Sequence, residues 1–427
     1  MKLVRSARKL SLLTATLVLA TLFSQCKSET KKEEAVKVAV NETILKAPEG
    51  FSVEEIGKEL GAVRHLTVAN NGDIYANRSV VKEGGKAIIL LRDKNQDGTI
   101  DEQKEFADVP GTGILVKENY LYASSNSGVY RYKLNDGHEV VDTNNPEKIV
   151  NGLIDMGRDN AKPFAIDGDD NLYVTIGSWN DACRDAATEK GMIPCTILDS
   201  AGGIWKFNAN KLNQTYADGT RYATGLKNAV GITWNAETNS LFATDHGRGG
   251  LSNFYPELYT KKQNDELPSE TFYELKENDD AGWPSTYYDH QKNKRVLAPE
   301  YGGDGEKASD EKFVEPLVGF PAHLGPNDVL FYTGDMFPER YKNGAFIAFH
   351  NQSSELKKGF LVGFVPFKNG KPDGDWEIFL DNFAGMDLAN PTEGDGLKHR
   401  PCGLAQGPDG ALYVCDDFGG SIFKITS

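Results

Sequence analysis

Short apolar runs recur along the chain, and a polar turn introduces each run. A turn with Gly or Asn leads into an aliphatic and then an aromatic residue. The aromatic positions of the six copies are Tyr75, Tyr122, Tyr173, Phe242, Phe346 and Tyr413. Such runs are typical of strands, and beyond the leader no segment keeps a helical period over three turns. The pattern predicts an all-β chain.

The spacing of these copies predicts the architecture. The aromatic positions are 47, 51, 69, 104 and 67 residues apart. A basic period of about 50 residues with insertions matches blades of four short strands, so six copies predict a six-bladed β-propeller. An array of β-sandwiches is the alternative, although nothing in the sequence marks a linker between halves.

Insertions lengthen the period, mainly in the second half of the chain. They cover residues 178–200, 247–281, 285–320 and 351–358. Loops of this length in a compact domain commonly carry function. Because propeller loops gather at one end of the central channel, we expect polar residues that are far apart in sequence to converge there.

Residues 1–26 have the pattern of an export signal. Basic residues precede an apolar run from Leu10 to Phe23, and Cys26 follows shortly after it. A Cys at this point resembles a bacterial lipoprotein signal, in which the Cys is lipidated. An ordinary secretory signal that is cut nearby is the alternative.

The remaining chain is predicted to be one tethered domain. Residues 27–44 are charged and poor in aromatic side chains, which predicts a flexible tether. Residues 45–427 then form the propeller, with no later stretch near the ~20 apolar residues of a membrane span. We expect a periplasmic or cell-surface protein that touches the membrane only through its lipid anchor.

Charge excludes one class of partner. The net charge of the chain is −15, and a phosphate backbone would repel it, so we expect no nucleic-acid partner. Grouped carboxylates can bind cations. Plain solubility is the other reason for such an acidic composition.

Four cysteines follow the leader and can pair in an oxidising compartment. Cys183 and Cys195 flank one loop. Cys402 and Cys415 bracket a Gly-Pro-Asp-Gly turn, so a hairpin would bring them onto neighbouring strands. We predict the disulfides Cys183–Cys195 and Cys402–Cys415, because the spacing fits neither a zinc site nor a redox Cys-x-x-Cys motif.

One short stretch follows the calcium-loop pattern. Asp93, Asn95, Asp97 and Asp101 place oxygens at positions 1, 3, 5 and 9 around a Gly at position 6. Position 12 is Lys104 in place of a bidentate Glu, and predicted strands flank the loop. A calcium site and a solvated hairpin turn both remain open.

A series of motifs in a fixed order resembles the glucose/sorbosone dehydrogenase family. The motifs are Gly-Leu-Lys-Asn-Ala-Val-Gly at 225–231, Thr-Asp-His-Gly-Arg-Gly-Gly-Leu at 244–251, Leu-Pro-Ser-Glu-Thr-Phe-Tyr at 267–273, Gly-Trp-Pro at 282–284, Phe-Tyr-Thr-Gly-Asp-Met-Phe-Pro at 331–338, and Arg-Pro-Cys-Gly-Leu with Asp-Asp between 400 and 417. The resemblance covers roughly residues 50–426. It implies a six-bladed β-propeller that binds pyrroloquinoline quinone (PQQ) and Ca²⁺ and oxidises sugars, polyols or sugar aldehydes outside the cytoplasm.

The resemblance also implies a set of cofactor-binding residues. PQQ carries three carboxylates, so its pocket needs fixed cations, preferably the planar fork of Arg. The candidates are Arg400, Lys227, Asn228, Arg248 and Arg64. Lys227 stands where the family usually has Arg, and it keeps the charge but not the bidentate geometry. Gly247 marks the loop whose backbone carbonyls hold Ca²⁺ in the family.

The chain departs from the family at the catalytic base, the residue that would take the proton of the substrate hydroxyl. The soluble glucose dehydrogenase branch has a His just before the strand that aligns with residues 164–166, and this chain has none there. Asp159 is one substitute, but a carboxylate titrates near ~4 and is a weak base at neutral pH. His350 is the better substitute, since it ends a predicted strand where other branches place a His. No Cys-x-x-Cys-His motif is present, so a separate cytochrome or quinone pool is expected to take the electrons.

Four histidines lie at predicted strand ends or in loops, at positions 246, 323, 350 and 399, and this suggests a shared pocket without defining a metal triad. Two further function classes remain open. One is a propeller that binds carbohydrate or a protein partner without chemistry, which the missing His favours. The other is a Ca²⁺-dependent, lactonase-like hydrolase, which would need a convergent cluster of carboxylates.

Overall fold

The computed structural model of the chain describes residues 43–309 and 312–427. The predicted leader, residues 1–26, and the predicted tether as far as residue 42 lie outside the described residues. Within the described ranges, no helix is long and apolar enough to cross a membrane.

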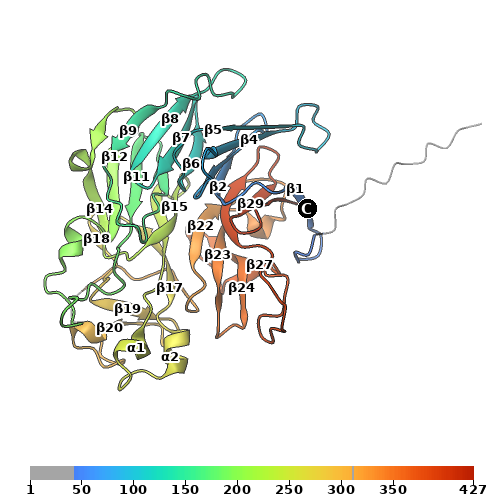
Figure 1. The fold of residues 1–427 in the computed structure, drawn as a ribbon. Coiled ribbons are helices and arrows are strands. Elements are labelled where there is room, and N and C mark those ends of the chain that lie inside the picture. Colours follow the sequence, from blue (N-terminus) through green and yellow to red (C-terminus); the bar gives the residue numbers. More distant parts are fainter. Residues whose placement is uncertain (1–42, 310–311) are drawn as a thin grey trace, which may run out of the picture. The chain divides into compact units, whose positions relative to one another are not determined.

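Six antiparallel sheets surround a central channel, and the first strand of each sheet lines it (Figure 1). The first two blades are β2 (Val63–Val68), β3 (Ile74–Arg78), β4 (Ile88–Arg92), β5 (Glu102–Phe106) and β6 (Ile114–Lys117), β7 (Tyr120–Ser125), β8 (Gly128–Lys133), β9 (Glu147–Asn151). The next two are β10 (Phe164–Ile166), β11 (Asn171–Ile176), β12 (Gly203–Asn208), β14 (Thr220–Thr224) and β15 (Ala229–Asn235), β16 (Ser240–Asp245), β17 (Glu270–Leu275), β21 (Val318–Phe320). The last two are β22 (Pro326–Phe331), β23 (Ala345–Ser353), β24 (Lys358–Val365), β27 (Glu377–Leu380) and β28 (Pro401–Gln406), β29 (Leu412–Asp416), β30 (Ile422–Thr426), β1 (Ser52–Gly57). The predicted all-β, six-bladed β-propeller is confirmed.

Short elements complete these sheets and their connections. Two parallel edge strands are β13 (Gln214–Thr215), beside β9, and β18 (Asp279–Asp280), beside β14. The two small hairpins are β19 (Thr286–Asp289) with β20 (Lys294–Leu297), and β25 (Phe367–Lys368) with β26 (Lys371–Pro372). Single 3₁₀ turns lie at Thr196–Asp199, Tyr216–Asp218, Pro299–Tyr301 and Glu339–Tyr341.

The repeated sequence unit corresponds to one particular strand. Each of its six aromatic residues is buried in the second strand of a blade, namely in β3, β7, β11, β16, β23 and β29. That strand has a neighbouring strand on either side and a neighbouring blade on either face, so it tolerates the least polarity. Hence the repeat was strongest there.

The ring is closed by strands from its two ends. β1 pairs antiparallel with β30, with Ser52 opposite Thr426. The sixth blade therefore contains the first strand and the last three strands of the propeller. This pairing removes the exposed edge that β30 would otherwise present.

The core lies between the blades. Tyr75 and Phe106 of the first blade pack against Leu121 and Tyr132 of the second. The rings of Phe106 and Tyr132 meet edge to face, with their centroids 5.4 Å apart. Equivalent clusters join the other blades, and they give the loops a rigid support.

The longest insertions form a small layer of their own. α1 (Leu251–Phe254), α2 (Lys261–Glu266) and the β19–β20 hairpin lie together beyond β17 (Figure 1). They pack around Leu251, Tyr259, Tyr287 and Val296. The two helices span four and six residues, which is too short for a helical period to show in the sequence.

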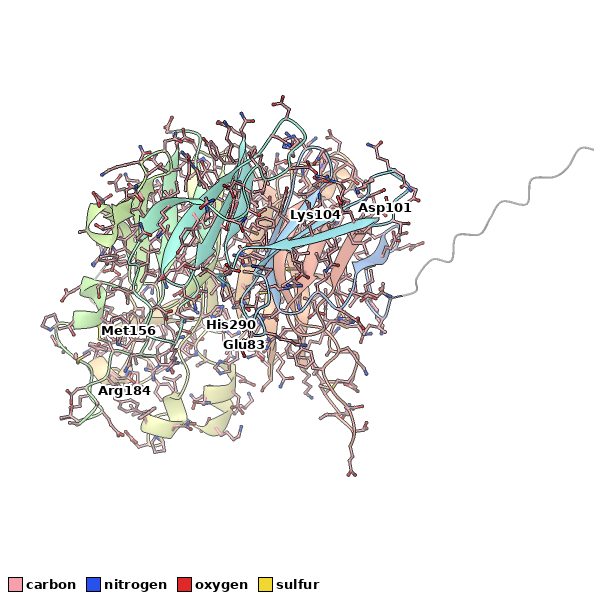
Figure 2. All side chains as sticks on the ribbon, turned by 45° about the horizontal axis from the view of Figure 1, so that its top comes forward. Glu83, Asp101, Lys104, Met156, Arg184 and His290 are labelled. Atoms are coloured by element: carbon pink, nitrogen blue, oxygen red, sulfur yellow. A yellow bond between two sulfur atoms is a disulfide. The ribbon has the colours of Figure 1, made fainter. Side chains whose placement is uncertain are left out.

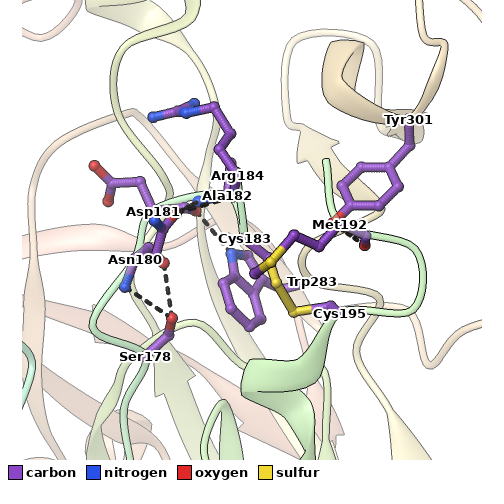
Figure 3. Close-up of a disulfide and its surroundings, with 10 residues drawn as sticks. All are labelled: Ser178, Asn180, Asp181, Ala182, Cys183, Arg184, Met192, Cys195, Trp283 and Tyr301. Atoms are coloured by element: carbon purple, nitrogen blue, oxygen red, sulfur yellow. Dashed lines mark hydrogen bonds between the residues drawn. A yellow bond between two sulfur atoms is a disulfide. The ribbon is translucent and has the colours of Figure 1, made fainter. Parts of the chain in front are cut away.

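The predicted disulfide Cys183–Cys195 is confirmed (Figure 3). Its loop is tied to the insertions, because Trp283 Nε1 donates a hydrogen bond to the carbonyl of Asp181 at 2.8 Å. Tyr301 Oη also donates to the carbonyl of Met192 at 3.4 Å. The disulfide therefore stabilises a layer that two separate insertions build.

The predicted disulfide Cys402–Cys415 is wrong, because both cysteines are free and buried. They do lie on the neighbouring strands β28 and β29, but the register shifts between Pro401 and Leu404. Cys415 Sγ donates to the carbonyl of Arg64 at 3.2 Å, and Cys402 Sγ accepts from Asn327 Nδ2 at 3.6 Å. The irregularity gives each thiol a different partner.

Removing the Cys183–Cys195 disulfide should destabilise the protein. Cross-linking a loop of this size lowers the conformational entropy of the unfolded chain, which stabilises the folded state by about 3 kcal/mol. Cys183→Ala/Cys195→Ala should therefore lower the urea midpoint of unfolding. Reductant should bring the wild type to the same midpoint and leave the double variant unchanged. An unchanged midpoint in the double variant would contradict this account.

Candidate active site

The polar residues singled out in the sequence converge at one end of the channel. In an antiparallel blade the first strand begins where the second strand ends, so both points lie at the same end. Arg64, Lys227 and Arg400 lie at the starts of first strands, and His350 and Asp417 lie at the ends of second strands. We call this end of the channel the mouth.

A buried carboxylate, Asp417, joins three blades at the mouth. Arg64 Nη1 donates to Asp417 Oδ2 at 2.9 Å, and Arg400 Nε donates to Oδ1 at 2.8 Å. His350 Nε2 lies 3.0 and 3.1 Å from the two oxygens. Burial acts to raise the pKa of Asp417, but the hydrogen bond and charge of His350, with both guanidiniums, hold it far below its ordinary value. Asp417 is therefore an anion at any physiological pH.

The contact with Asp417 fixes the proton of His350. A carboxylate can only accept here, so the proton of the neutral ring lies on Nε2 and Nδ1 keeps its lone pair. Nδ1 makes no hydrogen bond within the described part of the chain. Burial lowers the pKa of His350 below its ordinary value, and Asp417 opposes that shift. A neutral, oriented imidazole with one free nitrogen is the geometry of a general base.

The two arginines keep donors for an anion. Arg400 is about one-third exposed, and its two Nη atoms have no hydrogen bond or ion pair among residues 43–309 and 312–427. Arg64 Nε is buried without a hydrogen-bond partner. An unpaired buried donor costs free energy. The arrangement therefore favours a bound acceptor such as a carboxylate.

Lys227 lies at the mouth in a second cluster, where carboxylates neutralise its positive charge. Its Nζ is 3.1 Å from Asp159 Oδ2 and 3.4 Å from Asp181 Oδ1. Arg158 also pairs with Asp181, at 2.6 Å. Asn228 Nδ2 donates to Asp159 Oδ1 at 3.4 Å. Asp159 is thus held by Lys227 and Asn228, which makes it a poorer candidate for a base than His350.

Asp245 positions the loop that carries Lys227 and Asn228. Its oxygens accept the backbone N–H of Lys227 at 3.1 Å and that of Asn228 at 2.7 Å. Burial raises the pKa of Asp245 to about 7. The neighbouring His246 donates through Nε2 to the carbonyl of Pro326, and burial lowers its pKa to about 3. His246 is therefore a neutral structural residue between the Lys227 cluster and His350.

The loop after His246 carries two further candidates, Gly247 and Arg248, which have different surroundings. Gly247 lies at the mouth, where its N–H donates to the buried Glu270 at 2.9 Å. Arg248 instead pairs with Glu300, which also binds Arg184 at 2.7 Å. The side chain of Arg248 is 2% exposed. Its guanidinium links the two insertions and offers little to a ligand at the mouth.

The loop of residues 93–101 lies away from this site. It connects β4 to β5, and such a connection lies at the end of the blade opposite the mouth. Figure 2 shows Asp101 and Lys104 far from Met156 and His290, which mark the mouth side. The side-chain oxygens at Asp93, Asn95, Asp97 and Asp101 accept backbone N–H groups of their own exposed turn. A Ca²⁺ ion there stays a prediction, separate from the chemistry at the mouth.

Three groups offer potential metal ligands close together. One ligand atom each of His350, Cys402 and Asp417 lies within 4.8 Å of the others. Two guanidiniums already neutralise Asp417, and burial raises the pKa of Cys402 to about 12. A divalent cation would meet the positive charge of Arg64 and Arg400 there. The charges favour an anion over a cation at this point.

Sequence reasoning missed the carboxylates that hold the site together. Asp417, Asp245 and Glu270 all lie inside the quoted motifs, and Asp181 lies in the insertion at 178–200, two residues before Cys183. An anionic cofactor predicts cations in its pocket, and it gives no reason to expect buried acids beside them. The available signal was an acid directly beside an apolar strand, where a carboxylate is costly unless backbone N–H groups or cations satisfy it.

Lys162 is a fully buried lysine in the loop that carries Asp159. It is 1% exposed, and its Nζ donates to the carbonyl of Asn160 at 2.6 Å. Burial lowers its pKa to about 8, and Asp155 opposes the shift weakly. The lysine binds the backbone of this loop, but burying its ammonium group lowers the stability of the fold by an amount that depends on pH.

Comparison with known proteins identifies a matching family and a related sequence. A family model described as TrAA12-like matches residues 45–427. An uncharacterized protein of Borreliella burgdorferi is 27% identical over 407 residues, which cover 92% of this chain and 93% of that protein.

Solved structures share the fold at low identity. The holo form of the pyranose dehydrogenase PQQ domain from Coprinopsis cinerea has a TM-score of 0.69 at 18% identity, covering 90% of this chain and 97% of that one. A calcium structure of a Trichoderma reesei family AA12 enzyme has a TM-score of 0.70 at 18% identity, covering 90% and 96%. The PQQ-bound aldose sugar dehydrogenase from Streptomyces coelicolor has a TM-score of 0.55 at 15% identity, covering 89% and 99%.

Replacing Asp417 should strongly destabilise the protein. Asp417→Asn leaves Arg64 and Arg400 without their counter-charge, and breaking a buried pair in this way costs about 3–5 kcal/mol. Urea unfolding at neutral pH measures the loss. Asp335→Asn removes the exposed partner of Lys342 and should leave the midpoint nearly unchanged. Equal effects of the two substitutions would contradict the role given to Asp417.

Lys162 should make stability rise with pH. The unfolded chain keeps the ordinary pKa of 10.5 and the folded chain has about 8, so between these values the unfolded state binds more protons. Raising the pH from 7 to 10 should therefore add about 2 kcal/mol to the free energy of unfolding of the wild type relative to Lys162→Met. The exposed Lys133→Met is the matched control and should keep the wild-type slope. A wild-type slope in Lys162→Met would refute the assignment.

Proposed function

This chain belongs to the TrAA12-like family, and from that premise we propose that it is a PQQ-dependent dehydrogenase of a sugar or related polyol. The observation that carries the proposal is the group at Asp417. It combines a neutral, oriented His350 with two guanidiniums that keep free donors. Relatives of the same fold are described as PQQ-bound sugar dehydrogenases.

The residues at the mouth fit a small polyanion. PQQ has three carboxylates, and the free Nη atoms of Arg400 present the fork that such a group needs. The unpartnered Nε of Arg64 adds a buried donor. Lys227 contributes less, since Asp159 and Asp181 already neutralise it. When bound, PQQ supplies the acceptor for the hydride of the substrate.

His350 is the proposed catalytic base. Its Nδ1 takes the proton from the substrate hydroxyl oxygen as a hydride leaves the carbon that bears this hydroxyl. Asp417 holds the ring through Nε2 and stabilises the imidazolium that forms. Because burial keeps the pKa of His350 low, the ring is neutral and ready to accept a proton near neutral pH.

Ca²⁺ assistance is part of the proposal. The carbonyl oxygens of His246, Gly247 and Arg248 accept no hydrogen bond from the described residues, and Ca²⁺ prefers oxygen ligands. These carbonyl oxygens would hold the ion, which would supply Lewis-acid polarisation at the mouth.

We also propose export and lipid anchoring at Cys26, on the strength of the leader pattern. A separate cytochrome or quinone pool would then accept the electrons outside the cytoplasm.

Two carboxylates neutralise the positive charge of Lys227, and this supports a second candidate function. In it, the propeller has lost tight cofactor binding and only binds carbohydrate. Reconstitution separates the two. Purified protein is mixed with Ca²⁺ and PQQ, and dye reduction is followed across a panel of sugars and polyols. Dye bleaching supports the dehydrogenase. Tight PQQ binding without turnover, or no PQQ binding, would overturn it.

Substituting His350 should affect the chemical step far more than cofactor binding. His350→Gln should slow dye reduction by about 10²–10⁴-fold, the usual contribution of a general base, while PQQ absorbance titrations change little. His323→Gln is the matched control, since its ring binds the carbonyl of Asn264 outside the Asp417 group. Full activity in His350→Gln would remove the base assignment.

A further inference from the structure

Glu270 is a buried carboxylate at the start of β17 that has no role in the proposed chemistry. It is 2% exposed, and its Oε2 accepts the backbone N–H of Gly247 at 2.9 Å. It forms no ion pair within the described residues. A buried carboxylate without a cation is costly, so its retention beside the mouth calls for a reason.

The bond from Gly247 fixes the direction of one peptide group. In a trans peptide the N–H and the C=O point in opposite directions. Because Glu270 holds the N–H of Gly247, the carbonyl of His246 is turned away from β17. Asp245, paired with Thr271 across β16 and β17, holds the neighbouring loop through Lys227 and Asn228. Two buried acids thus set the backbone of two adjacent loops at the mouth.

The backbone at Gly247 leaves no space for a side chain. A Cβ at this position would lie 2.9 Å from the carbonyl oxygen of Pro268 and 3.0 Å from that of Ser269. The backbone of the His246 loop therefore lies directly against the segment before Glu270. The carbonyls of His246 and Gly247, both half-buried residues, receive no hydrogen bond from residues 43–309 or 312–427, so their oxygens remain available to a ligand.

We propose that Glu270 is a positioning residue that clamps the His246–Gly247 peptide, so that the carbonyls of this loop are presented as ligands to a divalent cation at the mouth. The proposal rests on the proposed function, since that ion is the Ca²⁺ of the PQQ site. Glu270 touches neither cofactor nor substrate. It acts through the peptide, as partners of metal ligands do elsewhere.

Calcium affinity tests the clamp without turnover. Ca²⁺ is titrated by calorimetry into the full chain with PQQ present, for the wild type, Glu270→Gln and Glu270→Leu. Gln keeps an acceptor for the Gly247 N–H and should bind Ca²⁺ nearly as the wild type does. Leu removes the acceptor and should weaken binding by about 10–100-fold, the usual effect of losing a partner of a metal ligand.

A matched control separates this effect from general destabilisation. Asp328 is also a buried carboxylate that accepts backbone N–H groups, from Val329 at 2.9 Å and Leu404 at 2.8 Å. Asp328→Asn should leave Ca²⁺ affinity unchanged. If Glu270→Leu fails to fold, Gly247→Ala replaces it, because a Cβ pushes the same peptide away from the Pro268 carbonyl and should weaken Ca²⁺ binding equally.

Each outcome bears on the proposal. Wild-type affinity in Glu270→Leu or in Gly247→Ala would overturn the clamp while leaving the proposed function intact. Equal weakening in Glu270→Gln and Glu270→Leu would show that charge, not the clamp, matters, and would also overturn it. If the wild type itself binds no Ca²⁺, the calcium part of the proposed function fails together with the clamp.

Discussion

The candidate site depends on a single buried negative charge, that of Asp417. Arg64 and Arg400 come from different blades and would repel one another without it, and His350, from a third blade, would lose the acceptor for its Nε2 proton. In a medium of low dielectric constant, unpaired charges at these distances are far costlier than they are in water. The carboxylate thus determines which charges can share the mouth, and it also selects the tautomer of His350.

Charge balance divides the mouth into two unequal halves. Around Asp417, cations outnumber the acid, and donor atoms remain for an incoming anion. Around Lys227, two aspartates already match the positive charge of Lys227 and Arg158. The first half suits recognition of a polyanion and proton transfer. The second half is better suited to holding the backbone of two loops in place.

The sequence was sufficient for the architecture because the repeat marks the most constrained strand of each blade. It also singled out Arg64, Lys227, His350 and Arg400, which lie at the same end of the channel. What it lacked was side-chain direction. Arg248 follows Gly247 directly, yet it turns towards Glu300, and a shift of register gives Cys402 and Cys415 separate partners. Such outcomes depend on tertiary packing, which neither spacing nor composition encodes.

Closure of the ring by β1 and β30 has a consequence for biosynthesis. The sixth blade cannot assemble until β30 has left the ribosome, so the nascent chain remains an open arc up to that point. Contacts between the two ends are the most distant in sequence and form slowly. The ring of blades therefore stays open during most of synthesis, and it closes in a single late step when β30 pairs with β1.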